Sequence, residues 1–356
     1  MKTPYYLFST SYLQRKQNTL HLQSCVDIDA LYEKKEEQAG ELLAENERVF
    51  SPKSYLPVQQ VESLYCFGET AFSSPALRLL GREGIPVHFF DFYGKFYGSF
   101  YSRETEASAP VILQQAVHYT TPALRLKLVS AIVQASLRAM NRLLQEYDTN
   151  ELPLTAQRVR IEEMQQEVQT ATGIKRIGGA EGFARRCYYE GLRKILHPIP
   201  FASRIVRPPD SPVNALLSYG YALLYAQLCS ELFRSGLSPV ISYVHEPRER
   251  RFSLALDLAD IFKPLVIDRL VLRLLKKEIL NTQQHFEQRE GGVYCTKEGT
   301  MLFTKQWEEY RKQTLYHPRY KRNVSLLTLL RLECLHLASY LKNKQPYQPC
   351  SLWSEE

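Results

Sequence analysis

SLALDLADIFKP, at residues 253–264, is the stretch around which the rest of this chain is organised. It is an apolar run that carries two acids, Asp257 and Asp260, three positions apart. Side chains at i and i+3 project from one face of a helix, and the surrounding leucines and alanines predict that this helix is buried. A buried carboxylate costs several kcal/mol unless it is paired or bound to a metal ion. The two acids therefore need partners, unless the helix is amphipathic and they face water or an arginine.

One candidate partner is His245, which lies in the turn-rich segment VHEP just upstream. A third acid, Glu181, begins the helical pattern AEGFARRCYYEGLRKIL. If Glu181, His245 and one of the aspartates met in the fold, their oxygen and imidazole ligands would suit Mg²⁺ or Mn²⁺. They come from three separate segments, so spacing alone does not bring them together. Alternatively, His245 caps a turn or is satisfied in a core, and Glu181 is an acid favoured by a helix N-terminus.

Basic side chains accompany this candidate site. A divalent ion can polarise a phosphodiester, and arginines can neutralise phosphate charge. The candidate phosphate-binding arginines are Arg204, Arg207, Arg248 and Arg251. Other chemistries lack their motifs: no second histidine follows His245 at the HExxH spacing, and neither a P-loop nor a GxSxG motif occurs.

The composition is that of a globular protein, and 356 residues are enough for two domains or one large one. No run of about 18 apolar residues occurs, and the N-terminus MKTPYYLFSTSY lacks an apolar core, so we expect neither a membrane span nor a secretory signal. The seven cysteines include no CxxC pair, which favours free thiols in a reducing cytoplasm. The net charge of +7 suits a polyanionic partner such as nucleic acid, although many unrelated proteins share it.

Short strand-like runs dominate the first hundred residues. YYLF (5–8) and NTLHLQ (18–23) predict a hairpin around the polar turn SYLQRKQ, and VESLYCFG (61–68) predicts a third strand. A capped helix, PALRLLGREG, and a hairpin with Gly94 and Gly98 as turn residues follow.

From about Val111 the apolar period becomes 3.6, which indicates helices. Pro122 marks a break, Gly173 ends one helix, and Gly178-Gly179 are interpreted as a turn before the next. A small hairpin near residues 290–303 and two further helices over 304–341 complete the pattern.

These patterns predict an α+β fold with a small N-terminal β-rich domain and a larger all-α domain. We place the β-rich domain at residues 1–98, a linker at 99–103 and the helical domain at 104–356. Residues 26–50 are a charged insertion that we interpret as solvated. The aromatic hairpins of the first domain would suit a dimer contact.

Several stretches resemble the CRISPR-associated Cas1 family, the integrases and endonucleases of spacer acquisition. The resemblance is carried by RPPDSPVNALLSYGYALLY and by VHEPRERRFSLALDLADIFKPLVIDRLVLRLLKK. EGFARRCYYE, EGGVYCTKEG, the closing PYQPCSLW and the N-terminal strands match as well. The similarity covers nearly the whole chain and is greatest to the branch found in type I systems.

The resemblance implies a catalytic, metal-binding set of Glu181, His245 and Asp260, with Asp257 as a supporting catalytic acid and Asn214 and Ser218 lining the site. It implies Mg²⁺ or Mn²⁺ as cofactor and a prokaryotic, cytoplasmic homodimer that works with a small Cas2-type partner. The implied reaction inserts captured DNA fragments into a CRISPR repeat by phosphodiester transesterification. Two other functions stay open, a standalone metal-dependent DNA repair nuclease and a non-catalytic DNA-binding scaffold.

The chain also departs from the family pattern at several positions. Residues 26–50 are longer than is usual, and Lys263 stands where the family typically has arginine, which keeps the charge but loses bidentate geometry. Arg250 and Phe252 replace a usual glycine and proline, without changing the spacing from His245 to Asp260.

Overall fold

The computed structural model describes residues 2–24, 54–91, 93–102, 108–249, 251–289, 291–317, 320–342 and 346–350. The chain divides into two compact units, Met1–Thr105 and Glu106–Glu356. The last strand of the first unit extends to Phe100, beyond the boundary predicted at residue 98. The predicted insertion at 26–50 lies outside the described residues.

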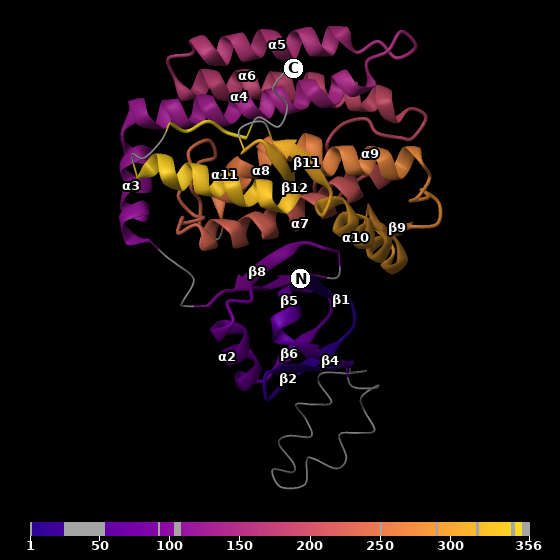
Figure 1. The fold of residues 1–356 in the computed structure, drawn as a ribbon. Helices are drawn as coiled ribbons and strands as arrows, with labels where there is room; N and C mark the ends of the chain where they lie inside the picture. The colour runs from indigo at the N-terminus through magenta and orange to yellow at the C-terminus, as the bar shows by residue number, and fades with distance from the viewer. Residues whose placement is uncertain are drawn as a thin grey trace. The chain divides into compact units, whose positions relative to one another are not determined.

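The first unit is β-rich, as predicted. Its elements are β1 (Thr3–Leu7), β2 (Ser11–Lys16), β3 (Thr19–Ser24), β4 (Ser54–Pro57), the 3₁₀ turn η2 (Val58–Gln60), β5 (Val61–Cys66), β6 (Thr70–Phe72), α2 (Ser74–Arg82), β7 (Val87–Phe90) and β8 (Phe96–Phe100). They form two four-stranded sheets, ordered β1-β5-β7-β8 and β4-β3-β2-β6 (Figure 1). Leucines and valines from both sheets and from α2 form the core of this unit.

The predicted first hairpin is wrong in its pairing. The run SYLQRK is strand β2, which pairs antiparallel with β3, whereas β1 joins the other sheet and pairs in parallel with β5. The turn consists of Gln17 and Asn18, and Gln17 has a positive φ of 55°. Leu13 and Leu20 are fully buried, so burying this apolar face outweighs the polar residues at the end of β2. Gly94, with a φ of 80°, is a turn residue as predicted, but Gly98 lies within β8.

The second unit is mostly helical. Its helices are α3 (Ala109–Thr120), α4 (Pro122–Tyr147), α5 (Thr155–Thr170), α6 (Ile174–Leu196), α7 (Pro212–Arg234), α8 (Ser253–Lys263), the π-helical turn η3 (Pro264–Asp268), α9 (Arg269–Lys276), α10 (Lys297–Arg311) and α11 (Leu326–Leu341). Helices α4, α5 and α6 pack against one another as a layer, and α8 packs against both α4 and α7 (Figure 1). Among the helices that the structure describes, none is long and apolar enough to cross a membrane.

Two details of the helical prediction are corrected. Gly178 and Gly179 lie inside α6 and do not form a turn; a Cβ at either position would meet nothing within 4 Å, and the helix continues through them. The unit also contains two short ribbons, β9 (Phe286–Arg289) with β10 (Gly292–Cys295) and β11 (Thr314–His317) with β12 (Arg322–Ser325). The first overlaps the small hairpin predicted near residues 290–303, but it begins earlier, at Phe286, and residues 297–303 belong to α10. The second interrupts what the periodicity presented as consecutive helices, so this unit is mostly helical and not all-α.

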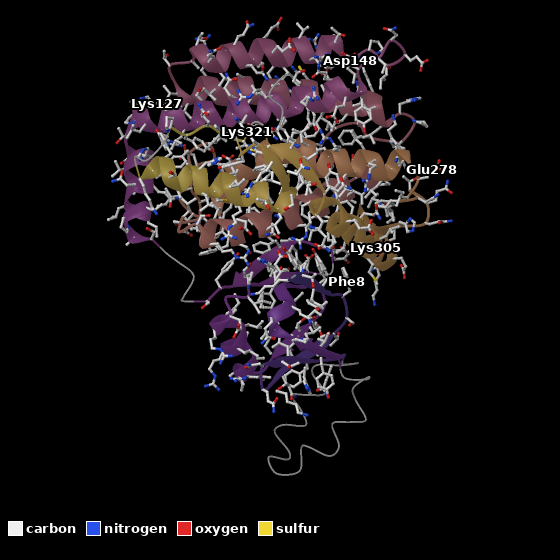
Figure 2. All side chains as sticks on the ribbon, viewed as in Figure 1. Phe8, Lys127, Asp148, Glu278, Lys305 and Lys321 are labelled. Carbon is white, nitrogen blue, oxygen red and sulfur yellow. The ribbon has the colours of Figure 1, made fainter. Side chains whose placement is uncertain are left out.

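Side-chain caps fix the ends of several elements. Ser73 accepts a hydrogen bond from the backbone N–H of Ala76 and begins α2, as predicted. Asp148, labelled in Figure 2, follows the C-terminal end of α4 and accepts from the backbone N–H of Leu154 at 2.8 Å and from Arg158 at 2.8 Å. These bonds tie the loop to the start of α5, so that α4 and α5 are joined by a short, ordered connection.

Candidate active site

Helix α8 buries both of the acids that SLALDLADIFKP carries. Asp257 is fully buried and Asp260 is 5% exposed, so neither carboxylate faces water. The helix continues into the π-helical turn η3 at Pro264, which has no N–H to donate to the carbonyl of Asp260. The hydroxyl of Ser136, on α4, donates to that carbonyl at 3.0 Å. The backbone beside Asp260 is therefore fixed by a neighbouring helix, in a turn type that often occurs at functional sites.

Asp257 holds the segment that carries His245. Its Oδ2 accepts from the backbone N–H groups of Tyr243 at 2.7 Å and Val244 at 3.0 Å. Its Oδ1 accepts from the backbone N–H of His245 at 2.9 Å and lies 2.8 Å from Nδ1 of the same residue. The imidazole is thus oriented through Nδ1, and Nε2 is the ring nitrogen that Asp257 does not contact. This arrangement, a carboxylate behind a histidine, is the one that usually orients metal-binding histidines.

The surroundings of His245 shift the pKa of its imidazole. Burial favours the neutral form, but the hydrogen bond to Asp257 and the negative charge of Asp260 outweigh it and raise the pKa of His245.

Asp260 is stabilised as a carboxylate by cations. Lys263 donates to its Oδ1 at 2.5 Å, and Arg185 donates to its Oδ2 at 3.2 Å. Burial alone would raise the pKa of Asp260, but the charges of Lys263 and Arg185, with that of His245, lower it. Asp260 is therefore ionised at any physiological pH.

Arg185 connects Asp260 to the third acid. It lies one turn after Glu181 on α6 and donates to the Glu181 carboxylate as well as to Asp260. The negative charges of Asp260 and Glu181 raise the pKa of Arg185 well above its ordinary value, even though burial acts in the opposite direction. The two carboxylates thus share one guanidinium, and α6 is positioned against α8 by this bridge.

Glu181, His245 and Asp260 have the chemistry that a divalent cation requires. Together they offer two carboxylates and one imidazole, whose Nδ1 is held by Asp257. Such a ligand set suits Mg²⁺ or Mn²⁺. In the part of the chain that the structure describes, no group of three or more His, Cys, Asp and Glu side chains is arranged to hold a metal ion. The cations of Arg185 and Lys263 balance the carboxylates in this arrangement. The donor set therefore fits the metal by ligand type.

Among the predicted lining residues and arginines, some are hydrogen-bonded to one another or to the backbone, and two arginines are exposed. Asn214 and Ser218, on α7, accept hydrogen bonds from Arg204 at 3.0 Å each. Arg251 donates to the backbone carbonyl of Glu246 and to the hydroxyl of Ser253, so its guanidinium is held by the loop. The two remaining predicted arginines, Arg207 and Arg248, are exposed.

Some residues of the site were not singled out from the sequence. The helical pattern places Arg185 on one stripe with Glu181, at the i+4 spacing, but the sequence assigned it no role at the site. Arg125, on α4, donates to the carbonyl of Tyr243 at 3.0 Å and to Glu246 at 2.7 Å, which braces the His245 turn from the other side. It lies 118 residues before Tyr243, and no local pattern indicates such a contact.

Comparison with known proteins places this geometry in a family. A family model described as CRISPR associated protein Cas1 matches residues 6–309. The CRISPR-associated endonuclease Cas1 2 of Moorella thermoacetica is 34% identical over 349 residues, which make up 98% of this chain and 99% of the relative. The solved structure of a CAS1 protein from Thermotoga maritima is 31% identical and superposes with a TM-score of 0.79, covering 99% of this chain and 100% of that one.

A casposase bound to integration product superposes with the same TM-score of 0.79 over 100% of this chain and 95% of the casposase. At 18% identity, that likeness is one of fold alone. The family model and the two relatives above 30% identity cover most or nearly all of the sequence. This chain therefore belongs to the CRISPR-associated Cas1 family.

Proposed function

We propose that this protein is a divalent-metal-dependent DNA integrase and endonuclease of CRISPR adaptation. The observation that carries the proposal is the arrangement of three residues from separate segments. Glu181 and Asp260 share Arg185, and His245 is oriented through Asp257, which lies three residues before Asp260 on α8. Relatives named as CRISPR-associated endonucleases and a casposase of the same fold, bound to integration product, support this chemistry.

Glu181, His245 and Asp260 would hold Mg²⁺ or Mn²⁺. When bound, such an ion supplies positive charge to a phosphodiester and to the oxygen that leaves it. The protein's own contribution is orientation: Asp257 keeps the His245 ring fixed through Nδ1, and Ser136 keeps the backbone of Asp260 fixed. Lys263 and Arg185 place two further positive charges beside the same carboxylates, where phosphate oxygens would meet them.

The proposed reaction is phosphoryl transfer. The 3′-hydroxyl of a captured DNA fragment attacks a phosphodiester at the boundary of a CRISPR repeat, one P–O bond forms and another breaks, and the released strand carries the new 3′-hydroxyl. When water replaces the attacking hydroxyl, the same site hydrolyses the strand. The arginines Arg204, Arg207, Arg248 and Arg251 are proposed to neutralise backbone phosphates.

The assembly is proposed from family membership. The protein would act in a prokaryotic cytoplasm as a homodimer, with the β-rich domain at residues 1–98 forming the dimer contact and residues 104–356 the catalytic domain. A small Cas2-type protein would bridge two such dimers. We also assign the chain to the branch found in type I systems.

The experiment that tests the proposal replaces His245 by alanine. His245→Ala should abolish Mn²⁺-dependent cleavage and strand transfer while leaving the affinity for DNA nearly unchanged, because the imidazole is a metal ligand and the cations remain. His197→Ala, at an exposed histidine that ends α6, is the matched control and should keep full activity.

Full activity of His245→Ala would rule out the metal assignment. Binding of DNA by the wild-type protein with no Mn²⁺-dependent cleavage or strand transfer would indicate a DNA-binding scaffold without turnover. Activity on branched DNA that does not change when the Cas2-type partner is added would indicate a standalone repair nuclease.

A further inference from the structure

A buried carboxylate outside the proposed ligand set connects α6, α7 and η3. Asp268, at the end of the π-helical turn, is 1% exposed. Its Oδ2 accepts from the hydroxyl of Tyr188 at 2.6 Å, and its Oδ1 accepts from the hydroxyl of Tyr221 at 2.6 Å. No lysine or arginine is among the hydrogen-bond partners that the structure gives Asp268. Two short bonds from phenols therefore fix both oxygens and, in turn, fix both tyrosine rings.

The ring of Tyr221 carries two cations. The guanidinium of Arg204 lies 5.4 Å from the ring centroid, and the ammonium of Lys263 lies 5.0 Å from it. Both distances are within the range at which a cation is attracted to the face of an aromatic ring. Two like charges would otherwise repel one another, so their approach to one ring needs compensation. Burial raises the pKa of Asp268 to about 6, so this carboxylate is mostly ionised at neutral pH, and its negative charge at the hydroxyl end of the same tyrosine compensates for the two cations.

Each of these two cations also contacts residues that we assign to the proposed site. Lys263 donates to the Asp260 carboxylate, and Arg204 donates to the side chains of Asn214 and Ser218. Arg204 comes from the Pro-rich segment between α6 and α7, whereas Lys263 ends α8. A single ring therefore contacts the positive charges of both the Pro-rich segment and the end of α8.

We infer that Tyr221 is a positioning residue, a cation–π platform anchored by Asp268 that holds Arg204 and Lys263 together as a subsite for phosphates of the DNA backbone. This inference rests on the proposed DNA-processing function and extends it, because it concerns binding of phosphate and not the metal. A phosphate that enters the subsite meets two charges that are already ordered, so less side-chain entropy is lost on binding. Tyr221 acts through the two cations and does not contact the reacting atoms.

The test measures the salt dependence of DNA binding by the full chain without metal. Affinity for a fluorescein-labelled DNA duplex is determined at several KCl concentrations, and each phosphate contact adds about 0.9 to the slope of log K against log salt. Tyr221→Leu should weaken binding about tenfold and reduce the slope by about 1–2, because both cations lose their platform. Tyr219→Leu removes a buried ring two positions away on α7, bonded to Thr304, and should leave the slope unchanged.

A folded Tyr221→Leu variant with the wild-type slope would overturn the inference, as would an equal loss in Tyr219→Leu. If Tyr221→Leu does not fold, Tyr221→Phe replaces it, since this variant keeps the ring and removes the hydroxyl that donates to Asp268. Tyr221→Phe should weaken DNA binding severalfold in the wild-type background and have no further effect when Arg204 and Lys263 are both glutamine. Additive effects would contradict a role through the cations. Because no metal is present, the result is independent of the outcome for His245→Ala.

Discussion

Replacing Asp257 by asparagine should both destabilise the helical unit and loosen the segment that carries His245. Each carboxylate oxygen of Asp257 accepts two hydrogen bonds, and the residue is fully buried. Asparagine has nearly the same shape, but only one of its two terminal atoms accepts a hydrogen bond. One pair of donors therefore keeps an acceptor, and the other pair faces an NH₂ group in a site that water does not reach.

The magnitude follows from these contacts. A hydrogen bond to a charged group contributes about 1.5–3 kcal/mol, so the loss of two should lower the free energy of unfolding by about 3–6 kcal/mol. For a unit of this size we expect the Tm to fall by roughly 10 °C. The imidazole of His245 also loses its fixed orientation, and loss of such a supporting bond typically weakens metal affinity about 10–100-fold.

Thermal unfolding by circular dichroism and titration of Mn²⁺ by calorimetry measure the two effects separately. Asp260→Asn is the matched control, an acid one helical turn away with different partners. It should remove Mn²⁺ binding but cost less stability, because Arg185 retains Glu181 as a partner. The reasoning is refuted if Asp257→Asn melts and binds Mn²⁺ as the wild-type protein does.

Two further predictions concern charged groups away from that turn. Burial raises the pKa of Glu333, which accepts from Tyr347 and from the backbone of Cys350, to about 7, so the folded state holds its proton more tightly than the unfolded state. This contribution to stability, up to about 3 kcal/mol, is present at pH 4 and is lost as the pH rises through 7. Glu333→Gln should therefore flatten the dependence of the unfolding free energy on pH between 5 and 8, as measured by urea titrations. An unchanged pH profile would contradict this prediction. Arg185→Gln removes the cation between the two proposed ligand carboxylates. The metal-free variant should therefore melt at a lower temperature than the wild type, and its Tm should rise more when Mn²⁺ is added, as differential scanning fluorimetry can measure. An equal rise in Tm would show that Arg185 does not balance the carboxylate charges in the absence of metal.

Much of the architecture could be predicted because local patterns and tertiary packing agree. The serine cap and proline that begin α2, the break at Pro122 and the apolar period of the later helices all correspond to observed elements. The misassigned hairpin at β1 and β2 shows where local reading fails. Polar residues at one end of β2 favoured a turn, but the choice of partner strand depends on which apolar face the rest of the unit can bury. The ribbon of β11 and β12 was missed for the same reason.

The site was predicted unevenly. Asp257 and Asp260 were indicated by their position in an apolar run, and their burial and need for partners are confirmed. Which partner belongs to which acid was not evident from spacing: Asp257 contacts the His245 turn, whereas Asp260 contacts Lys263 and Arg185. The resemblance to the Cas1 family implies that Asp260 is a metal ligand and that Asp257 is a supporting acid. This division of roles stays a prediction.

The sequence by itself indicated that Asp257 and Asp260 need partners if their helix is buried, because an apolar run surrounds both acids; the structure shows that both are buried. It also determined family membership, through segments long enough to be specific. Only the tertiary structure decided the pairings that link α4, α6, α8 and η3, since these join residues that lie far apart in the chain. Ser136 with Asp260, Arg185 with Asp260, and Tyr188 with Asp268 are 124, 75 and 80 residues apart. Hydrogen bonds and ion pairs act over a few ångströms, and sequence spacing reports such proximity only within a helix, a strand or a turn.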